Sequence, residues 1–284
     1  MMKLLFPTDF SPVAENAYIY ALKLAERLNA SVTVLHIYEV LEVHSWIEES
    51  MDMSQLNEKI TLGEFEKYRE QTEMLNRIAK ENHLEEIEVN FSLKESGEIV
   101  TAIVEEAEAI HADMIIMGTA GQHGLSEIFF STTSAKVMEN AKCPVYIVPN
   151  TANYRGIENV ALTLQYKQGE LELIETSIAL AKLLRAHLHC LHVDVYDPEK
   201  IKLRREEVEH AFANQPGISF HTHYELDTEK GILDYMKANN MDVIIMRVHR
   251  QSLFRELFSH SLAKRIAYHS DIPLIALPEA EKSA

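Results

Sequence analysis

Cysteine is nearly absent from this chain: Cys143 and Cys190 are the two in 284 residues, and they form neither a CxxC pair nor a disulfide framework. No apolar run approaches the ~20 residues that a membrane-spanning helix needs. The first residues, MMKLLFPTDF, meet a proline and an aspartate after three apolar residues, which is unlike a signal-peptide core. These absences predict a cytoplasmic protein without a membrane partner.

Positive charge is also scarce, since 27 Lys and Arg stand against 44 Asp and Glu, for a formal net charge of −17. Residues 1–150 carry 11 basic and 25 acidic side chains (−14), which leaves 16 and 19 (−3) for the remainder. Nucleic-acid binding needs clustered Lys and Arg, so we expect no nucleic-acid partner. With 46% hydrophobic residues, the chain can bury a substantial core.

Recognisable catalytic motifs are missing too. The chain has no Walker lysine, no Ser-His-Asp arrangement with a nucleophile elbow and no metal-binding carboxylate pair in a recognisable frame. Phosphoryl transfer needs cationic stabilisation of developing charge, and His123 is the one titratable neighbour of the glycine turn at residues 118–121. We therefore predict no catalytic residues.

The most informative stretch is residues 113–149, DMIIMGTAGQHGLSEIFFSTTSAKVMENAKCPVYIVP. The apolar residues 114–117 predict a buried strand. Gly118 and Gly121 then flank a bend in which a ligand can approach the backbone closely. The hydroxyls of residues 131–134 predict the start of a helix, whose free amides favour a phosphate. Any α/β sheet has such turns, so this fragment alone is weak support for phosphate binding.

Strands and helices alternate along the first half of the chain. Strands are predicted at residues 4–6, 31–37, 89–93, 114–117 and 145–148, and helices at residues 14–28, 53–82, 98–110 and 135–141. This order predicts a mostly parallel sheet with helices on both faces.

The same pattern then repeats, at residues 160–164, 172–184, 186–193, 241–248 and 271–278. AHLHCLHV at residues 186–193 matches ASVTVLHI at 30–37, and MDVIIMRV at 241–248 matches ADMIIMGT at 112–119. We infer a duplication, with domains at residues 1–150 and 151–284 and a linker around residues 150–156.

Gly118, Gly121 and Thr132 match the pattern G-x2-G-x9-G-[S/T] of the universal stress protein family, with Ser131 where the family has its third glycine. PTDFSP at residues 7–12 and AKCPVYIVP at 141–149 are also typical of it, so the whole chain resembles a tandem universal stress protein. The resemblance implies an α/β fold of two tandem Rossmann-like (adenine nucleotide α-hydrolase-like) domains. Each would have a five-stranded, mostly parallel sheet of order 3-2-1-4-5.

The resemblance also implies an ATP-binding regulatory stress-response protein with at most slow ATP hydrolysis. Thr8 and Asp9 would hold the nucleoside end, Ile37 would contact adenine, and other residues would hold ribose and phosphates, with Mg²⁺ bridging the phosphates. The full set of expected site residues is Pro7, Thr8, Asp9, Ile37, Gly118, Gly121, Gln122, Ser131, Thr132 and Thr133. From its residue type alone, Asp9 is equally a helix cap or turn former.

The second copy departs from the first where the ligand would lie. Gln165 stands for Asp9, Arg247 and Arg250 stand for Gly118 and Gly121, and His260-Ser261 stands for Ser131-Thr132. Because an arginine side chain covers the backbone that glycine exposes, we predict one nucleotide site per chain. The basic residues Arg247, Arg250, Arg255, Lys264 and Arg265 are expected to pair with the acidic first half.

Histidines alternate on two predicted strands, His187 and His189 on one and His221 and His223 on the other. Four imidazoles there can surround a transition metal, but alternation toward solvent is the favoured interpretation, and no metal site is predicted. His36 and His192, near the ends of matching strands, are expected to satisfy local hydrogen bonds.

In the family the fifth strands pair across a dimer axis. The resemblance thus implies an intrachain pseudo-dimer through residues 145–148 and 274–277, and a homodimer of the whole chain is left open. The acidic residues 39–52 are expected to lie over the nucleotide. Two alternatives remain: a structural or dimerisation module that binds no nucleotide, and an ATP-using hydrolase or nucleotidyl transferase.

Overall fold

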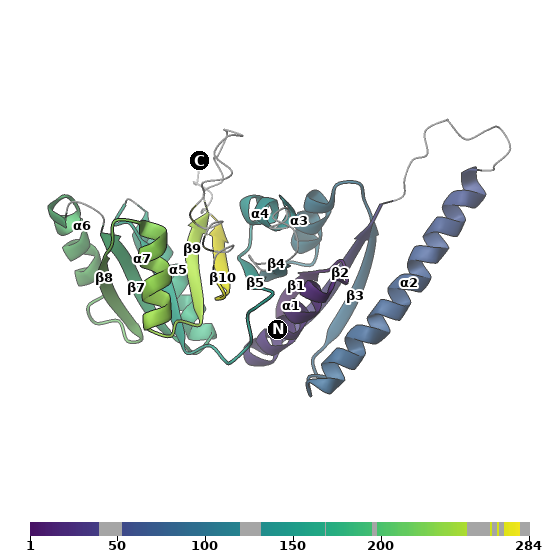
Figure 1. Cartoon of the computed structure of the whole chain (residues 1–284), viewed down its shortest axis with the longest axis horizontal. Coiled ribbons are helices and arrows are strands. Elements are labelled where there is room, and N and C mark those ends of the chain that lie inside the picture. The colour runs from purple at the N-terminus through teal and green to yellow at the C-terminus, as the bar shows by residue number, and fades with distance from the viewer. Residues whose placement is uncertain are drawn as a thin grey trace. The chain divides into compact units, whose positions relative to one another are not determined.

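The computed structural model describes residues 1–39, 53–119, 132–167, 169–194, 198–248 and 270–278, together with Leu262 and Ile266. The chain divides into two compact units (Figure 1). Unit 1 comprises Met1–Gly118 and Ala141–Cys143, and unit 2 comprises Thr119–Asn140 and Pro144–Ala284.

Unit 1 is built on a parallel sheet of order β3-β2-β1-β4. The strands are β1 (Met2–Pro7), β2 (Ala30–Tyr38), β3 (Val89–Glu95) and β4 (Met114–Thr119). Because β1 lies between β2 and β4, the strand order reverses at β1. In open parallel sheets, that reversal is where ligands bind, beyond the carboxyl ends of the strands.

Three helices accompany this sheet, α1 (Pro12–Leu28), α2 (Met53–Glu81) and α3 (Ile99–Ala109). α1 packs against β1, β2 and α2, while α3 packs against β2. Ser11 caps α1 by accepting from the Ala14 N–H, and Asn29 ends it in the left-handed conformation with φ 51°. The predicted end of this helix at Asn29 is therefore confirmed.

Unit 2 contains six strands in the order β5-β10-β9-β6-β7-β8. They are β5 (Val145–Pro149), β6 (Asn159–Leu164), β7 (His187–Asp194), β8 (Ile218–Tyr224), β9 (Val243–Val248) and β10 (Leu274–Pro278). β5 and β10 pair antiparallel, and the other pairs are parallel. The order predicted for each copy, 3-2-1-4-5, is that of β8-β7-β6-β9-β10.

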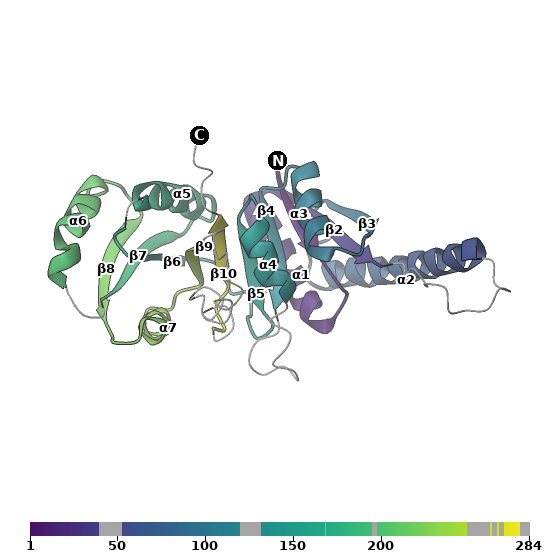
Figure 2. The ribbon, with the colours of Figure 1, turned by 90° about the horizontal axis from the view of Figure 1, so that it is seen from above.

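The helices of unit 2 are α4 (Thr132–Asn140), α5 (Glu170–Leu183), α6 (Pro198–Ala211) and α7 (Thr228–Ala238). Figure 2 shows α5 and α7 on opposite faces of the sheet that β6, β7 and β9 form. α4 begins at Thr132, within the capping hydroxyls predicted at residues 131–134 and three residues before the helix predicted at 135–141, so Thr132, Thr133 and Ser134 form its first turn.

The predicted duplication extends to the backbone. Three pairs of equivalent residues share the left-handed conformation: Phe10 (φ 59°) and Tyr166 (55°), Asn29 (51°) and Arg185 (50°), and His111 (54°) and Asn240 (50°). Side chains other than glycine adopt this conformation infrequently, so its recurrence at matching positions reflects a common local structure. The two predicted α/β copies are thus confirmed.

The compact units do not follow the copy boundary expected at residue 150. α4 and β5 belong to unit 2, because β5 hydrogen-bonds to β10 and α4 contacts both strands. The division into domains at residues 1–150 and 151–284 stays a prediction.

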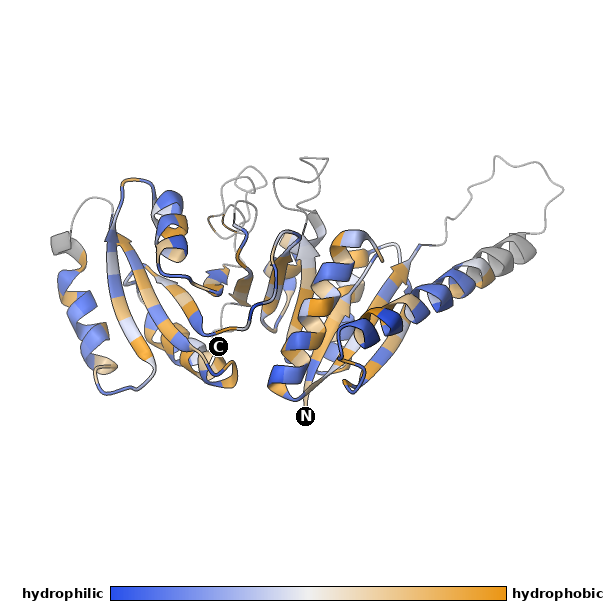
Figure 3. Cartoon of the chain, turned by 60° about the horizontal axis from the view of Figure 1, so that its bottom comes forward, coloured by the Kyte–Doolittle hydropathy of each residue, from blue (hydrophilic) through white to orange (hydrophobic). Residues whose placement is uncertain are grey.

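Hydrophobic residues concentrate on the strands and on the helix faces turned toward them (Figure 3). Leu4, Leu5 and Phe6 in β1 are fully buried, as are Val160, Ala161 and Leu162 in β6. Strands buried on both faces carry continuous apolar runs, as the sequence pattern predicts. None of the described helices combines the length and hydropathy needed to cross a lipid bilayer.

Candidate functional site

The turn that follows β1 contains Thr8, whose backbone is held on both sides. The Thr8 N–H donates to the Leu35 carbonyl in β2 at 2.9 Å. The Thr8 hydroxyl oxygen accepts from the Phe10 N–H at 2.9 Å, which closes the turn. The Thr8 amide is therefore not available to a ligand, while the Thr8 hydroxyl donates to none of the residues that the structure describes.

Asp9 forms an Asx turn beside the start of α1. Its Oδ1 accepts from the Ser11 N–H at 3.0 Å, and the side chain is exposed. Within the described part of the chain, Oδ2 and the backbone N–H of Asp9 make no hydrogen bond. Asp9 thus has the turn-forming role considered for it, and this role leaves one carboxylate oxygen and the backbone amide without a partner among the described residues.

His36 in β2 supports the same turn from the side. Its Nδ1 lies 2.9 Å from the Thr8 carbonyl oxygen, which can only accept, so the network assigns the imidazole proton to Nδ1. The rings of Phe10 and Tyr68 lie 4.7 Å and 6.0 Å from the His36 ring. The expectation that His36 satisfies a local hydrogen bond is confirmed.

Gly118 in β4 lies against α1. A Cβ atom at this position would come within 3.1 Å of both the Ala17 Cβ and the Val13 carbonyl oxygen. Packing against α1 therefore favours a residue without a side chain here, whether or not a ligand binds. This reason for glycine is separate from the phosphate access that the sequence pattern predicts.

Strand register brings the unit 1 site residues to one sheet edge. β1 and β4 pair with Leu4 opposite Met114, and continuing that register places Thr8 opposite Gly118. β1 and β2 pair with Pro7 opposite Leu35, and the half-buried Ile37 is two residues further along β2. The predicted residues Pro7, Thr8, Asp9, Ile37 and Gly118 thus lie at or just beyond the carboxyl ends of β1, β2 and β4.

The predicted phosphate-side residues lie in another part of the chain. Thr132 and Thr133 form the first turn of α4 in unit 2, and Thr133 is half-buried. Gly121, Gln122 and Ser131 lie outside the described residues, as do His123 and the acidic residues 40–52.

Two buried hydroxyls near these elements escaped the sequence reasoning. Thr119, directly after Gly118, is 3% exposed, and its hydroxyl has no hydrogen-bond partner among the described residues. The Tyr68 hydroxyl in α2 is likewise buried without a partner, and burial raises the pKa of Tyr68 to about 12. Neither residue type carries a local pattern that would predict this.

The second copy reproduces the turn around its own histidine. His192 Nδ1 lies 2.9 Å from the Leu164 carbonyl oxygen, and the Tyr166 ring lies 5.1 Å from the His192 ring. These contacts correspond to those of His36 with Thr8 and Phe10. The expected local hydrogen bond of His192 is also confirmed.

At the position of Asp9, however, the second copy is closed by its own side chains. The Gln165 N–H, equivalent to the Asp9 N–H, donates to Glu170 Oε1 at 2.8 Å. Glu170 is 6% exposed. The Asp9 amide, which has no hydrogen-bond partner among the described residues, therefore has a hydrogen-bonded counterpart in the second copy.

Arg247, the counterpart of Gly118, makes no ion pair with an acidic side chain among the described residues, and its predicted pairing with the acidic first half stays a prediction. Its guanidinium donates to the Gly169 carbonyl at 2.9 Å, at the start of α5. This hydrogen bond connects Arg247 in β9 to the turn before α5. At the equivalent position, the first copy has Gly118, which packs against α1. The other basic residues of the predicted run, Arg250, Arg255, Lys264 and Arg265, lie outside the described residues, with His260 and Ser261.

The four histidines considered for a metal are only partly together. His187, His189 and His221 approach one another on one face of β7 and β8, whereas His223 contacts Tyr235 of α7. Within the described ranges, no three His, Cys, Asp or Glu side chains form a group that could hold a metal ion. The solvent-facing alternation is wrong for the first three, because they are half-buried and hydrogen-bonded.

Comparison with known proteins identifies the family. The model of the universal stress protein family matches residues 1–149 and 166–278. Universal stress protein MJ0531 of Methanocaldococcus jannaschii is 31% identical over 147 residues, which cover 51% of this chain and 81% of that protein. Universal stress protein MJ0577 of the same organism is 29% identical over 156 residues, or 51% and 93%.

Among solved structures, a universal stress protein from Archaeoglobus fulgidus DSM 4304 shares this fold. The likeness covers 98% of both chains, with a TM-score of 0.73 and 18% sequence identity. Since the family model matches both copies, the chain belongs to the universal stress protein family as a tandem two-domain member.

Proposed function

We propose that this chain is a cytoplasmic regulatory protein that binds one ATP, on its first copy, and hydrolyses it slowly at most. One observation carries the proposal. The Asp9 amide at the strand-order reversal is free within the described residues, whereas the equivalent Gln165 amide is occupied by Glu170 at 2.8 Å. A ligand can use the first amide and not the second.

The groups that remain free around Asp9 suit the nucleoside end of ATP. Asp9 Oδ2 can accept from hydroxyls or an exocyclic amine, while the Asp9 N–H and the Thr8 hydroxyl can donate. Ile37, which lies near the carboxyl end of β2 and is half-buried, offers apolar surface to a base. The Thr8 amide, already bonded to Leu35, takes no part.

The phosphate end is assigned from the sequence pattern. Gly118, Gly121, Gln122, Ser131, Thr132 and Thr133 would hold ribose and phosphates, with Mg²⁺ bridging the phosphate oxygens. Support comes from α4, which begins at Thr132, because the first amides of a helix have no partner within the helix and favour an anion. Serine at position 131 keeps the amide that glycine would offer.

We further propose that the second copy acts as a built-in dimerisation partner. β10 pairs antiparallel with β5, with Leu274 opposite Ile147, Ile275 opposite Tyr146 and Ala276 opposite Val145. An antiparallel pair of this kind closes the edge strand of each copy, and free edges otherwise invite association with other chains. A homodimer of the whole chain is therefore not required by this arrangement.

The test is isothermal titration of nucleotide-stripped protein with ATP, with and without Mg²⁺. We expect one site per chain. Asp9→Ala should weaken binding about tenfold or more, through loss of a charged hydrogen-bond acceptor. Gln165→Ala, the same change at the matching turn of the second copy, should leave affinity and stoichiometry unchanged.

Three results would contradict the proposal: no heat with protein shown to be nucleotide-free, two sites per chain, or equal losses from the two variants. The first result would favour a purely structural stress module. Multiple turnovers of ATP with a small-molecule acceptor would instead favour the hydrolase or nucleotidyl transferase alternative.

A further inference from the structure

Three imidazoles of the second copy surround one hydroxyl. The Ser219 Oγ lies 3.0 Å from His187 Nε2, 2.8 Å from His221 Nε2 and 3.4 Å from His189 Nδ1. His189 Nδ1 and His221 Nε2 are themselves 3.3 Å apart. We call these four residues the histidine cluster. It has no equivalent in the first copy, where serine and threonine occupy the positions of His187 and His189.

The hydrogen bonds of the cluster suit neutral imidazoles. His189 Nε2 lies 3.2 Å from Asn159 Oδ1, so the network assigns the His189 proton to Nε2 and leaves Nδ1 as an acceptor. Nδ1 faces Ser219 and His221, either of which can donate to it. A second proton on His189 would occupy Nδ1 and turn the acceptor that these neighbours share into a donor.

Helix α7 packs over this face of the sheet. The Tyr235 ring lies 5.6 Å from the His221 ring and 6.3 Å from the His223 ring, and Tyr235 is 8% exposed. One turn earlier, a Cβ on Gly231 would come within 2.8 Å of Val193 Cγ1 in β7. Both halves of α7 therefore rest on the strands that carry the cluster, the first through Gly231 and the second through Tyr235.

The groups around the cluster do little to stabilise a positive charge on its imidazoles. Besides the cluster's own His187 of β7 and His221 of β8, they are His223 of β8, Tyr235 of α7 and the uncharged Asn159 of β6. The charges that act on His189 come from His187 and His221, and the one that acts on His221 comes from His187. Asp234 of α7 interacts with His223 and with lysines instead.

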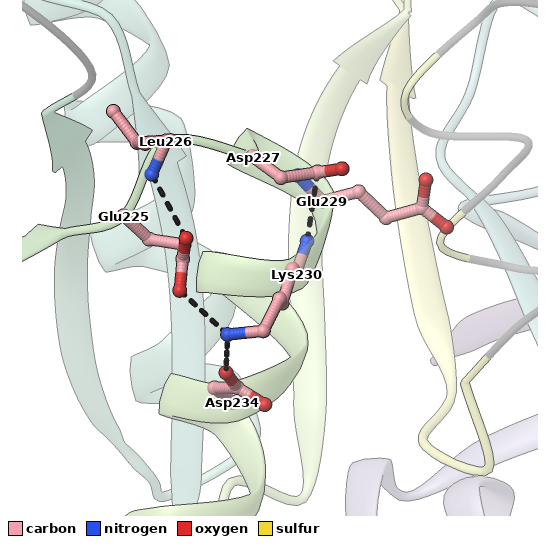
Figure 4. A network of polar contacts seen from close by, with 6 residues as sticks. All are labelled: Glu225, Leu226, Asp227, Glu229, Lys230 and Asp234. Atoms are coloured by element: carbon pink, nitrogen blue, oxygen red, sulfur yellow. Dashed lines mark hydrogen bonds and ion pairs between the residues drawn. The ribbon is translucent and has the colours of Figure 1, made fainter.

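The first turn of α7 is held by a different set of contacts (Figure 4). Lys230 Nζ lies 2.5 Å from Glu225 Oε2 and 2.8 Å from Asp234 Oδ2, and Asp227 caps the helix. Hydrogen bonding to Lys230 keeps the pKa values of Glu225 and Asp234 below their usual range. These carboxylates therefore remain charged when imidazoles begin to take up protons.

We propose that the histidine cluster is an acid-sensitive latch, which holds the second half of α7 on the sheet while neutral and releases it when protonated. Mild acid would then loosen residues 232–238, while the Asp227 cap and the contact of Lys230 with Glu225 keep the first turn in place. The latch lies in the second copy and does not depend on a bound nucleotide, so it stands or falls separately from ATP binding.

The direction of the pH effect follows from the protonation of His189. Burial, followed by the neighbouring His187 and His221, lowers the pKa of His189 from 6.5 to about 4. When α7 loosens, the imidazole regains a usual pKa and binds a proton more readily. The latch is therefore fully stable above about pH 6.5 and weakens as the pH falls toward about 4, about tenfold in the opening equilibrium per pH unit for each proton taken up.

Amide hydrogen exchange of nucleotide-free protein at about pH 7 and about pH 5, corrected for intrinsic rates, tests the proposal. The opening constants of residues 232–238 should rise about tenfold or more at the lower pH. Helix α3, the equivalent helix of the first copy without a histidine cluster, serves as the internal control and should change little. Equal responses of α3 and α7 would overturn the proposal.

His189→Gln keeps an amide donor and acceptor but cannot take up the proton, so it should reduce the pH response of α7 by about tenfold. His210→Gln, a change of the same type at an exposed site in α6, should leave the response intact. If His189→Gln does not fold, titration of the imidazole protons of the wild-type protein tests the proposal instead. His189 should then stay neutral to about pH 5.

Titration of His189 near ~6.5, the ordinary pKa of an imidazole, would overturn the latch. So would loss of α7 protection on adding a chelator at neutral pH, because the imidazoles would then bind a metal rather than respond to protons.

Discussion

His36 Nδ1 lies 2.9 Å from the Thr8 carbonyl, and in the second copy His192 Nδ1 lies 2.9 Å from the Leu164 carbonyl. In both copies an imidazole of the second strand fastens the turn after the first. His36 is half-buried, whereas His192 is 8% exposed. We therefore expect the same contact to stabilise the two copies to different extents.

Replacing either histidine by leucine should test this difference. His36→Leu leaves a partly solvated carbonyl without its donor, and we expect a loss of about 1 kcal/mol in the free energy of unfolding. His192→Leu leaves a buried carbonyl unpaired, and we expect about 2 kcal/mol. Urea unfolding of the two variants measures both values. Equal losses would show that burial does not decide the strength of this bond.

Gly118→Ala should destabilise the protein by about 1 to 3 kcal/mol, because the new Cβ would be 3.1 Å from Ala17 and from the Val13 carbonyl. Gly63→Ala in α2 is the matched control, since nothing lies within 4 Å of its Cβ position. There alanine should stabilise by about 0.5 to 1 kcal/mol, as a better helix former. Thermal unfolding distinguishes the two, and a neutral Gly118→Ala would mean that α1 does not press on β4.

The ion pair of Lys94 and Glu106 should be worth more than most in this acidic protein. Lys94 Nζ lies 2.5 Å from Glu106 Oε2, and the Glu106 side chain is 10% exposed. Lys94→Met would leave that carboxylate buried without a counter-ion, at a cost of about 2 to 4 kcal/mol. Lys94→Met combined with Glu106→Leu should recover most of the loss, since no charge then remains buried. A double-mutant cycle in urea that shows no coupling between the two residues would refute this account.

Cys143 should react slowly with alkylating reagents. Burial raises the pKa of its thiol from 9.0 to about 11, with further contributions from Asp113 and Glu108. Only the thiolate reacts, so near pH 8 the thiolate fraction, and with it the alkylation rate, should be about 100-fold below that of an unperturbed thiol. The rate should rise as the pH approaches 11 and should become ordinary in denaturant. Rapid labelling of native protein at neutral pH would contradict the burial that we describe.

Much of the fold was predictable because its signals are local. The end of α1 at Asn29 follows from a residue that tolerates the left-handed conformation, and the strands follow from short apolar runs. The sequence suggested only part of the role of Gly118. Its absent side chain suggested access for a ligand, but its packing against Ala17 could not be predicted, because Ala17 is far away in the sequence.

The sequence was also only partly informative about the histidine cluster. Alternation along a strand identifies which histidines share a face of the sheet, but whether that face is exposed to solvent depends on which helix packs against it. Tyr235 of α7 covers it here, so side chains expected in solvent became half-buried around Ser219. Arg247 likewise found its partner in a backbone carbonyl, which no pattern of charges predicts.

By itself the sequence determined the order of strands and helices, the duplication and the family, because apolar periodicity, caps and motif spacing are properties of neighbouring residues. Tertiary structure alone decided which polar groups are occupied: among the described residues the Asp9 amide has no hydrogen-bond partner, whereas the equivalent Gln165 amide donates to Glu170. Whether an amide can meet a ligand depends on which side chain folding brings against it, and that choice is made in three dimensions.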